Sequence, residues 1–138
     1  MYYVVCIILY VINNLAVMDA KEMLKRTKKF GYDCIDLSNS LYGSYLKNHV
    51  RGQLIRCSTS VGSNYRAARL GQSKAAFIAK ISICIEEADE SIMWLELISE
   101  KNLLPVRFNE ELNRLIGEAS ELTSILISTR KTLSQKNT

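Results

Sequence analysis

Apolar side chains recur three and four positions apart through four long segments of this 138-residue chain, and very little interrupts them. Pro105 is the single proline, and there are only six glycines. A β-rich fold needs turn residues at the end of every strand, whereas the spacing of three and four is that of one face of a helix. A chain of this length builds one core. We therefore predict a single all-α domain.

The limits of the helices follow from residues that start or stop a helix. Asp19 and Ser73 can cap the free N–H groups of a first turn, and Pro105 prevents a helix from continuing. The predicted helices cover residues 19–42, 48–70, 74–101 and 109–133, and residues 134–138 form a frayed tail. Because the three connections are short, we expect consecutive helices to run antiparallel in an up-and-down four-helix bundle.

Each predicted helix carries an apolar stripe that should face the core. The second helix also contains small residues at 58, 60, 62 and 63, which would let another backbone come close. The third helix is apolar on more than one side, since Ile78, Ile85 and Trp94 lie off its main stripe. A helix of this kind buries one side in its own bundle and the other against a second subunit.

The first eighteen residues differ from the rest, because they contain no charged side chain. The apolar run over residues 2–12 is shorter than the roughly 20 residues needed to cross a bilayer. A secretory signal peptide would require positively charged residues at its N-terminus, and these are missing here. The favoured interpretations are that translation begins at Met18 or that this leader packs on a neighbour, and a signal peptide is the less favoured alternative. We expect no membrane partner.

Catalytic and metal-binding patterns are missing from the sequence. Cys6, Cys34, Cys57 and Cys84 stand far apart and fit small buried residues in a reducing cytoplasm, although one incidental disulfide is not excluded. The acidic run over residues 86–90 invites a metal site, but di-iron bundles also require histidines, and His49 is the single one. We predict no catalytic residue, no metal and no cofactor.

Charge divides the chain into two halves. Residues 21–80 contain twelve lysines and arginines against three acids, whereas residues 81–121 contain three against ten. Arg51, Arg66 and Arg69 fall within about 60° of one another on a helix at 100° per residue. A second basic stripe on the first helix consists of Lys21, Lys25, Lys28 and Lys29. Such stripes can track phosphates, or they can pair with the acidic helices.

Several segments closely resemble the signature of the bacterial four-helix-bundle family, also called ribosomal RNA intervening-sequence proteins. The segments are residues 53–69 (QLIRCSTSVGSNYRAAR), 73–80 (SKAAFIAK), 86–91 (EEADES) and 94–97 (WLEL). The resemblance covers roughly residues 19–132. Cys57 stands where the motif favours serine, and the leader has no counterpart in the family, which supports a start at Met18.

The resemblance implies an up-and-down bundle that assembles as a ring-like homopentamer. It also implies kinship with the accessory protein of diversity-generating retroelements, a basic pentamer that binds nucleic acid and a reverse transcriptase. The expected partners are therefore other copies of the chain, RNA or DNA, and a nucleic-acid-processing protein. The biochemical role of the family itself is largely unassigned.

We interpret the chain as a non-enzymatic oligomeric scaffold that binds nucleic acid. The predicted phosphate contacts are Arg51, Arg56, Arg66, Arg69, Lys25 and Lys28, and the predicted oligomer interface contains Glu86, Glu90 and Trp94. The alternative is a protein-interaction module whose arginines pair with carboxylates of an adjacent subunit and serve assembly alone.

Overall fold

The computed structural model describes residues 20–135, and this part of the chain is almost entirely helical. The long helices are α2 (Ala20–Ser38), α3 (Tyr45–Arg69), α4 (Lys74–Glu100) and α5 (Asn109–Gln135), with a short 3-10 helix, η1 (Val106–Phe108), before α5. No strand occurs within residues 20–135. The apolar leader, its Cys6 and the predicted cap Asp19 lie outside the described residues.

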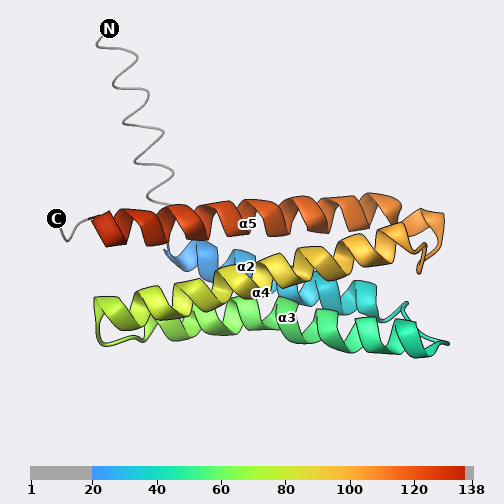
Figure 1. Ribbon diagram of the computed structural model, residues 1–138, viewed down its shortest axis with the longest axis horizontal. Coiled ribbons are helices and arrows are strands. Elements are labelled where there is room, and N and C mark those ends of the chain that lie inside the picture. Colours follow the sequence, from blue (N-terminus) through green and yellow to red (C-terminus); the bar gives the residue numbers. More distant parts are fainter. Residues whose placement is uncertain (1–19, 136–138) are drawn as a thin grey trace, which may run out of the picture.

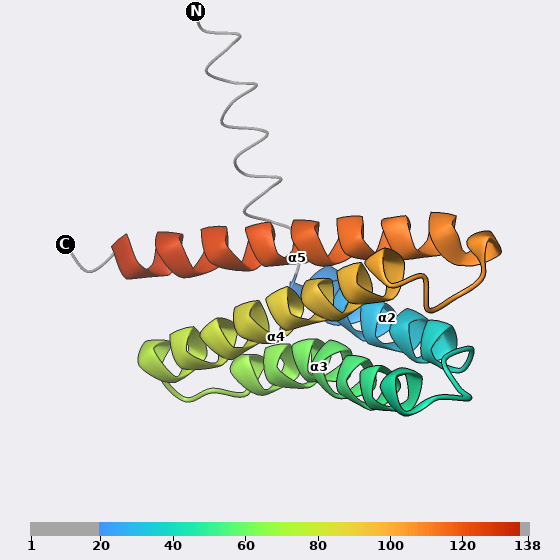
Figure 2. The same ribbon diagram turned by 45° about the vertical axis from the view of Figure 1, so that its right-hand side comes forward.

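The helices form an antiparallel bundle, as predicted (Figure 1). Helix α3 packs against both α2 and α4, and α4 packs against α5, whereas the contact between α2 and α5 is much smaller. The turned view shows α5 lying across the top of the bundle while α2, α3 and α4 stay close together (Figure 2). Helix α3 is therefore central to the half of the bundle that carries the basic residues.

The core consists of the apolar stripes that the helical spacing predicts. Its largest fully buried side chains are Phe30, Leu41, Leu54, Ile81, Leu95, Ile98, Leu112, Leu115, Leu122, Leu126, Val50 and Val61. Ile85 and Trp94, which lie off the main stripe of α4, are only partly buried. Burying these side chains removes apolar surface from water along the whole length of the bundle and is the main stabilising contribution to the fold.

The connection between α2 and α3 differs from the prediction. Helix α2 ends at Ser38 rather than near residue 42, and α3 begins at Tyr45 rather than near residue 48. The start of α3 is explained by a serine cap: the side chain of Ser44 accepts a hydrogen bond from the Lys47 backbone N–H at 3.1 Å. Gly43 before it has a φ of +96°, a conformation that suits glycine.

The predicted cap of α4 is confirmed. Ser73 accepts a hydrogen bond from the Ala76 backbone N–H at 3.0 Å. Helix α5 continues two residues beyond its predicted end, to Gln135. None of the helices within residues 20–135 contains an apolar stretch sufficient to span a lipid bilayer.

Candidate nucleic-acid interface

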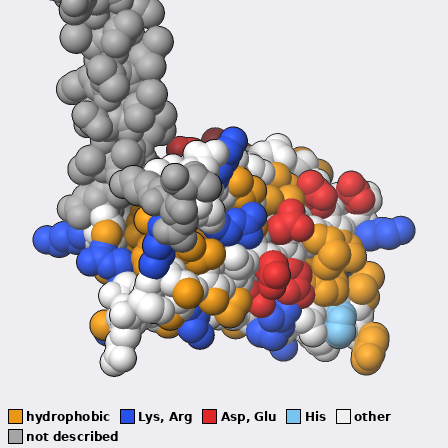
Figure 3. Space-filling view, turned by 60° about the vertical axis from the view of Figure 1, so that its left-hand side comes forward, with side chains coloured by type: hydrophobic (Ala, Val, Ile, Leu, Met, Phe, Trp, Pro, Cys, Tyr) orange, Lys and Arg blue, Asp and Glu red, His pale blue; other side chains and the backbone are white. Residues whose placement is uncertain are grey.

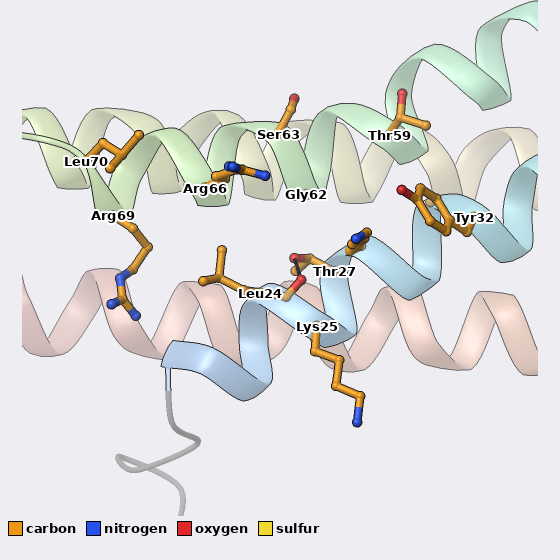
Figure 4. A pocket seen from close by; sticks show the side chains of 12 residues that line it. Leu24, Lys25, Thr27, Tyr32, Thr59, Gly62, Ser63, Arg66, Arg69 and Leu70 are labelled. Carbon is orange, nitrogen blue, oxygen red and sulfur yellow. Dashed lines mark hydrogen bonds between the residues drawn. The ribbon is translucent and has the colours of Figure 1, made fainter.

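A groove of about 780 Å³ opens between α2 and α3 (Figure 4). We call it the α2–α3 groove. It is lined from α2 by Leu24, Lys25, Thr27, Lys28, Gly31 and Tyr32, and from α3 and its C-terminal cap by Thr59, Gly62, Ser63, Arg66, Arg69 and Leu70.

Two glycines determine where the walls of the groove meet. A Cβ at Gly31 would lie 3.2 Å from the Thr59 Cα, and a Cβ at Gly62 would lie 3.4 Å from the Lys28 backbone nitrogen. The backbones of α2 and α3 therefore touch at these points, as the small residues of α3 predicted. The two helices diverge from there toward the start of α2, where Leu24, Arg66 and Arg69 lie (Figure 4).

Four of the six predicted phosphate contacts line this one groove: Lys25 and Lys28 from α2, with Arg66 and Arg69 from α3. All four side chains are exposed. The ion pairs found within residues 20–135 involve other cations, namely Arg26, Lys29, Arg56 and Arg114. Folding thus brings together cations that are some forty positions apart in sequence and leaves them without a carboxylate partner in the described part of the chain.

The side chains in the groove differ in direction. Arg69 extends from α3 toward the side of α2, Arg66 lies along α3, and Lys25 points away from α3 (Figure 4). The ammonium nitrogen of Lys28 lies 5.5 Å from the centroid of the Tyr32 ring. Arg66 and Arg69 also occupy the last turn of α3, where a cation stabilises the helix dipole. Their position therefore has a structural benefit in addition to any role in binding.

The other two predicted phosphate contacts lie outside the groove. Arg51 is half-buried on α3. Arg56 pairs with two carboxylates of α4, through Nη1 with Glu87 at 3.1 Å and through Nη2 with Glu90. The hydrogen bond from Arg56 lowers the pKa of Glu90. The guanidinium of Arg56 is therefore already engaged by carboxylates, unlike the four groove cations.

The predicted interface residues surround this same ion pair. Glu90 also accepts a hydrogen bond from the Trp94 indole N–H at 3.3 Å, and Glu86 is exposed on the same helix. Acidic side chains gather on this face next to a hydrophobic group and the histidine (Figure 3). The acidic cluster, which consists of Glu86, Glu87 and Glu90 on α4, thus lies apart from the α2–α3 groove and contributes no residue to its lining.

An aromatic cluster that the sequence did not predict adjoins this acidic face. The rings of Tyr45 and His49 are stacked with centroids 6.4 Å apart, and His49 meets Trp94 edge-on at 5.7 Å. Tyr45 is 88% exposed. Tyr45 and His49 are one turn apart on α3, a spacing that could have revealed the pair once α3 was known to start at residue 45.

The thin contact between α2 and α5 contains the most buried ion pair of residues 20–135, that of Arg26 with Glu118. Arg26 donates from Nε to Glu118 at 2.6 Å and lies 2.9 Å from Glu121, and Arg114 reaches Asp33 at 2.8 Å. Sequence reasoning missed the role of Arg26, because it lies between Lys25 and Lys28 and has the same charge. The basic residues of α2 therefore have two roles: Arg26 joins α2 to α5 within the bundle, whereas Lys25 and Lys28 line the groove.

Groups suited to nucleophilic or metal chemistry are buried or dispersed. Cys34, Cys57 and Cys84 are free and buried, and burial raises the pKa of Cys34 and of Cys84 to about 12. A thiol with such a pKa is a weak nucleophile. Among residues 20–135, no three His, Cys, Asp or Glu side chains are arranged to hold a metal ion.

Comparison with known proteins connects this bundle to one family. Residues 19–128 match the family described as 23S rRNA-intervening sequence protein. A crystal structure of a protein of unknown function from the S23 ribosomal protein family of Bacteroides thetaiotaomicron is similar, with a TM-score of 0.74 and 28% sequence identity. The similarity covers 83% of this chain and 99% of that one. A search of curated proteins finds no match.

Proposed function

Since this chain belongs to the family of 23S rRNA-intervening sequence proteins, we propose that it is a non-enzymatic scaffold that binds nucleic acid, RNA or DNA, through the α2–α3 groove. The observation that carries the proposal is the gathering of Lys25, Lys28, Arg66 and Arg69 around one groove with no acidic residue in its lining. Cations that neutralise phosphates release condensed counterions, and this release supplies most of the sequence-independent affinity for nucleic acid.

Assembly is a second part of the proposal. The family resemblance favours a ring-like homo-oligomer, a pentamer, with a nucleic-acid-processing protein as a further partner. The partly buried Ile85 and Trp94 and the exposed Met93 and Tyr45 supply apolar surface that a neighbouring copy would cover. A ring would repeat the groove in every subunit, so that one strand could contact several grooves and gain affinity through multivalency.

The salt dependence of RNA binding tests the role of the groove. Four phosphate contacts to a single strand predict a slope of about −3 for the logarithm of the binding constant against the logarithm of salt concentration. The double variant Arg66→Glu/Arg69→Glu should bind at least about tenfold more weakly and lower the slope by more than about 1.

A matched control separates the groove from net charge. The variant Lys101→Glu/Arg107→Glu changes the charge by the same amount at two exposed positions between α4 and α5. It should keep an affinity near that of the wild type. Equal losses in both double variants, or RNA binding that does not respond to salt, would remove the basis for the proposal.

The alternative function is a protein-interaction module in which the charged faces serve assembly alone. The aromatic cluster beside Glu90 is the observation that favours it, because an exposed aromatic surface is typical of protein interfaces. This alternative predicts that Arg66 and Arg69 pair with Glu86 and Glu90 of an adjacent subunit. Native mass measurement of Arg66→Glu/Arg69→Glu would then detect smaller assemblies, whereas the nucleic-acid proposal predicts an unchanged mass.

A further inference from the structure

We infer that the α2–α3 groove is specific for single-stranded nucleic acid and that Tyr32 is its stacking platform for an unpaired base. This inference rests on the proposed function and specifies the class of ligand at the same site. Four features of the groove support it: its apolar side chains, its volume, the exposed ring of Tyr32, and the cations that line it, with Lys28 beside that ring.

The apolar side chains distinguish this groove from a simple phosphate-binding surface. Leu24 and Leu70 line it together with the cations, and Leu70 is 77% exposed. A duplex presents charged phosphates to a protein surface and keeps the faces of its bases stacked inside, so it would leave these leucines without a suitable contact. An unpaired strand can turn the apolar face of a base toward them.

The volume of the groove points to the same class of ligand. About 780 Å³ lies within the range of pockets that enclose drug-sized molecules, roughly 300–1,000 Å³. Such a space accommodates individual bases or nucleotides of an unpaired strand. A double helix could contact only the rim.

Tyr32 has the exposure that stacking requires. Its side chain is 57% exposed at the end of the groove opposite Arg69 (Figure 4). Aromatic rings in positively charged grooves are the usual platforms for bases of single strands, and stacking tolerates any base because every base has a π-face.

The cations are placed to hold the phosphates that lead away from a stacked base along the groove. Lys28 lies 5.5 Å from the Tyr32 ring centroid, so its ammonium group can meet a phosphate next to that base. Arg66 and Arg69 continue the positive charge along the groove from α3. A strand entering at Tyr32 would thus meet a ring, two leucines and three cations along the groove.

The test compares three labelled probes by fluorescence anisotropy with the full chain: a 12-nucleotide single-stranded RNA, the same RNA in a duplex, and a single strand of equal length that lacks bases. The wild type should bind the single strand at least about tenfold more tightly than the duplex or the abasic strand. Tyr32→Leu should reduce affinity for the single strand about tenfold and leave the duplex unchanged. Tyr32→Phe, which keeps the ring, should stay within about twofold of the wild type.

Tyr42→Leu is the matched control, because Tyr42 is 67% exposed but lies outside the groove. It should have no effect on any of the probes. Equal affinity for all three probes, or a single-strand affinity that Tyr32→Leu does not change, would overturn the inference. Salt-dependent binding with the same affinity for single strand and duplex would overturn the inference but leave the proposed function intact. The absence of RNA binding would overturn both the inference and the proposed function.

Discussion

Gly31 on α2 lies so close to Ser58 on α3 that a Cβ at position 31 would stand 3.2 Å from the Ser58 carbonyl oxygen. The neighbouring atoms are backbone and cannot move without shifting a helix. We therefore expect Gly31→Val to lower the free energy of unfolding by about 2 kcal/mol through overpacking. Urea denaturation followed by circular dichroism measures the change, and a variant as stable as the wild type would show that α2 and α3 are not in contact there.

Gly117 on α5 provides the opposite prediction. It is exposed in the middle of a helix, and a Cβ there would have no neighbour within 4 Å. Replacing glycine by alanine in such a position removes conformational freedom from the unfolded chain, so Gly117→Ala should raise the free energy of unfolding by about 0.5–1 kcal/mol. The same urea titration tests this. A destabilised variant would mean that another surface covers Gly117.

The ion pair between Arg26 and Glu118 should matter more than an exposed pair. Both side chains are about four-fifths buried, and Arg26 contacts Glu118 through two nitrogens. Arg26→Met should lower the free energy of unfolding by about 1 kcal/mol, because Glu118 would lose its charged partner. Lys29 is more exposed than Arg26, so Lys29→Met should change the free energy of unfolding by less than about 0.5 kcal/mol. Similar effects of the two substitutions would contradict the role assigned to Arg26.

Stability should fall in acid partly through Asp33. Burial alone would raise the pKa of its carboxyl group, but hydrogen bonds from Lys29 and Arg114 outweigh burial and hold it below 3.8. A carboxyl whose pKa is lower in the folded state contributes stability above the pKa of the unfolded state and loses it as the pH falls through the folded value. Unfolding free energies measured between pH 7 and pH 2.5 should therefore decline less steeply below pH 4 for Asp33→Asn. Parallel curves would exclude this linkage.

The buried thiols should be protected from alkylation. Burial raises the pKa of Cys34 and of Cys84 to about 12, so both are protonated at pH 8 and shielded from reagent. Mass spectrometry of peptides after iodoacetamide treatment should detect labelling of Cys34 and Cys84 only when urea is present. Rapid labelling of the native protein would mean that the core opens frequently.

Helical spacing predicted the bundle and most of its core, because the positions that repeat every three or four residues are those that a helix turns inward. The end of α2 and the start of α3 were placed wrongly, since Ser44 looks like any other loop serine until its cap hydrogen bond is seen. The close contact of α2 and α3 was predicted only in outline, from the small residues of α3.

The candidate site could be predicted only in part. Charge and helical angle identified Arg66 and Arg69, and Lys25 and Lys28, as two stripes, but no local pattern reveals that the stripes share a groove. Arg56 has the same charge and the same helix, yet it faces α4 and its carboxylates. Which partner a surface cation meets depends on the packing of helices. Tyr32 lies one turn after Lys28 on α2, so their proximity is local, but the groove that both share with Arg66 and Arg69 exists only in the folded chain.

Ultraviolet cross-linking of a 12-nucleotide RNA to the full chain, followed by mass spectrometry of the attached peptides, tests the central claim most directly. If the α2–α3 groove binds nucleic acid, the cross-links will fall within residues 24–32 and 59–70. Cross-links concentrated at residues 45–49 and 86–94, around the aromatic cluster and the acidic face, would contradict the account.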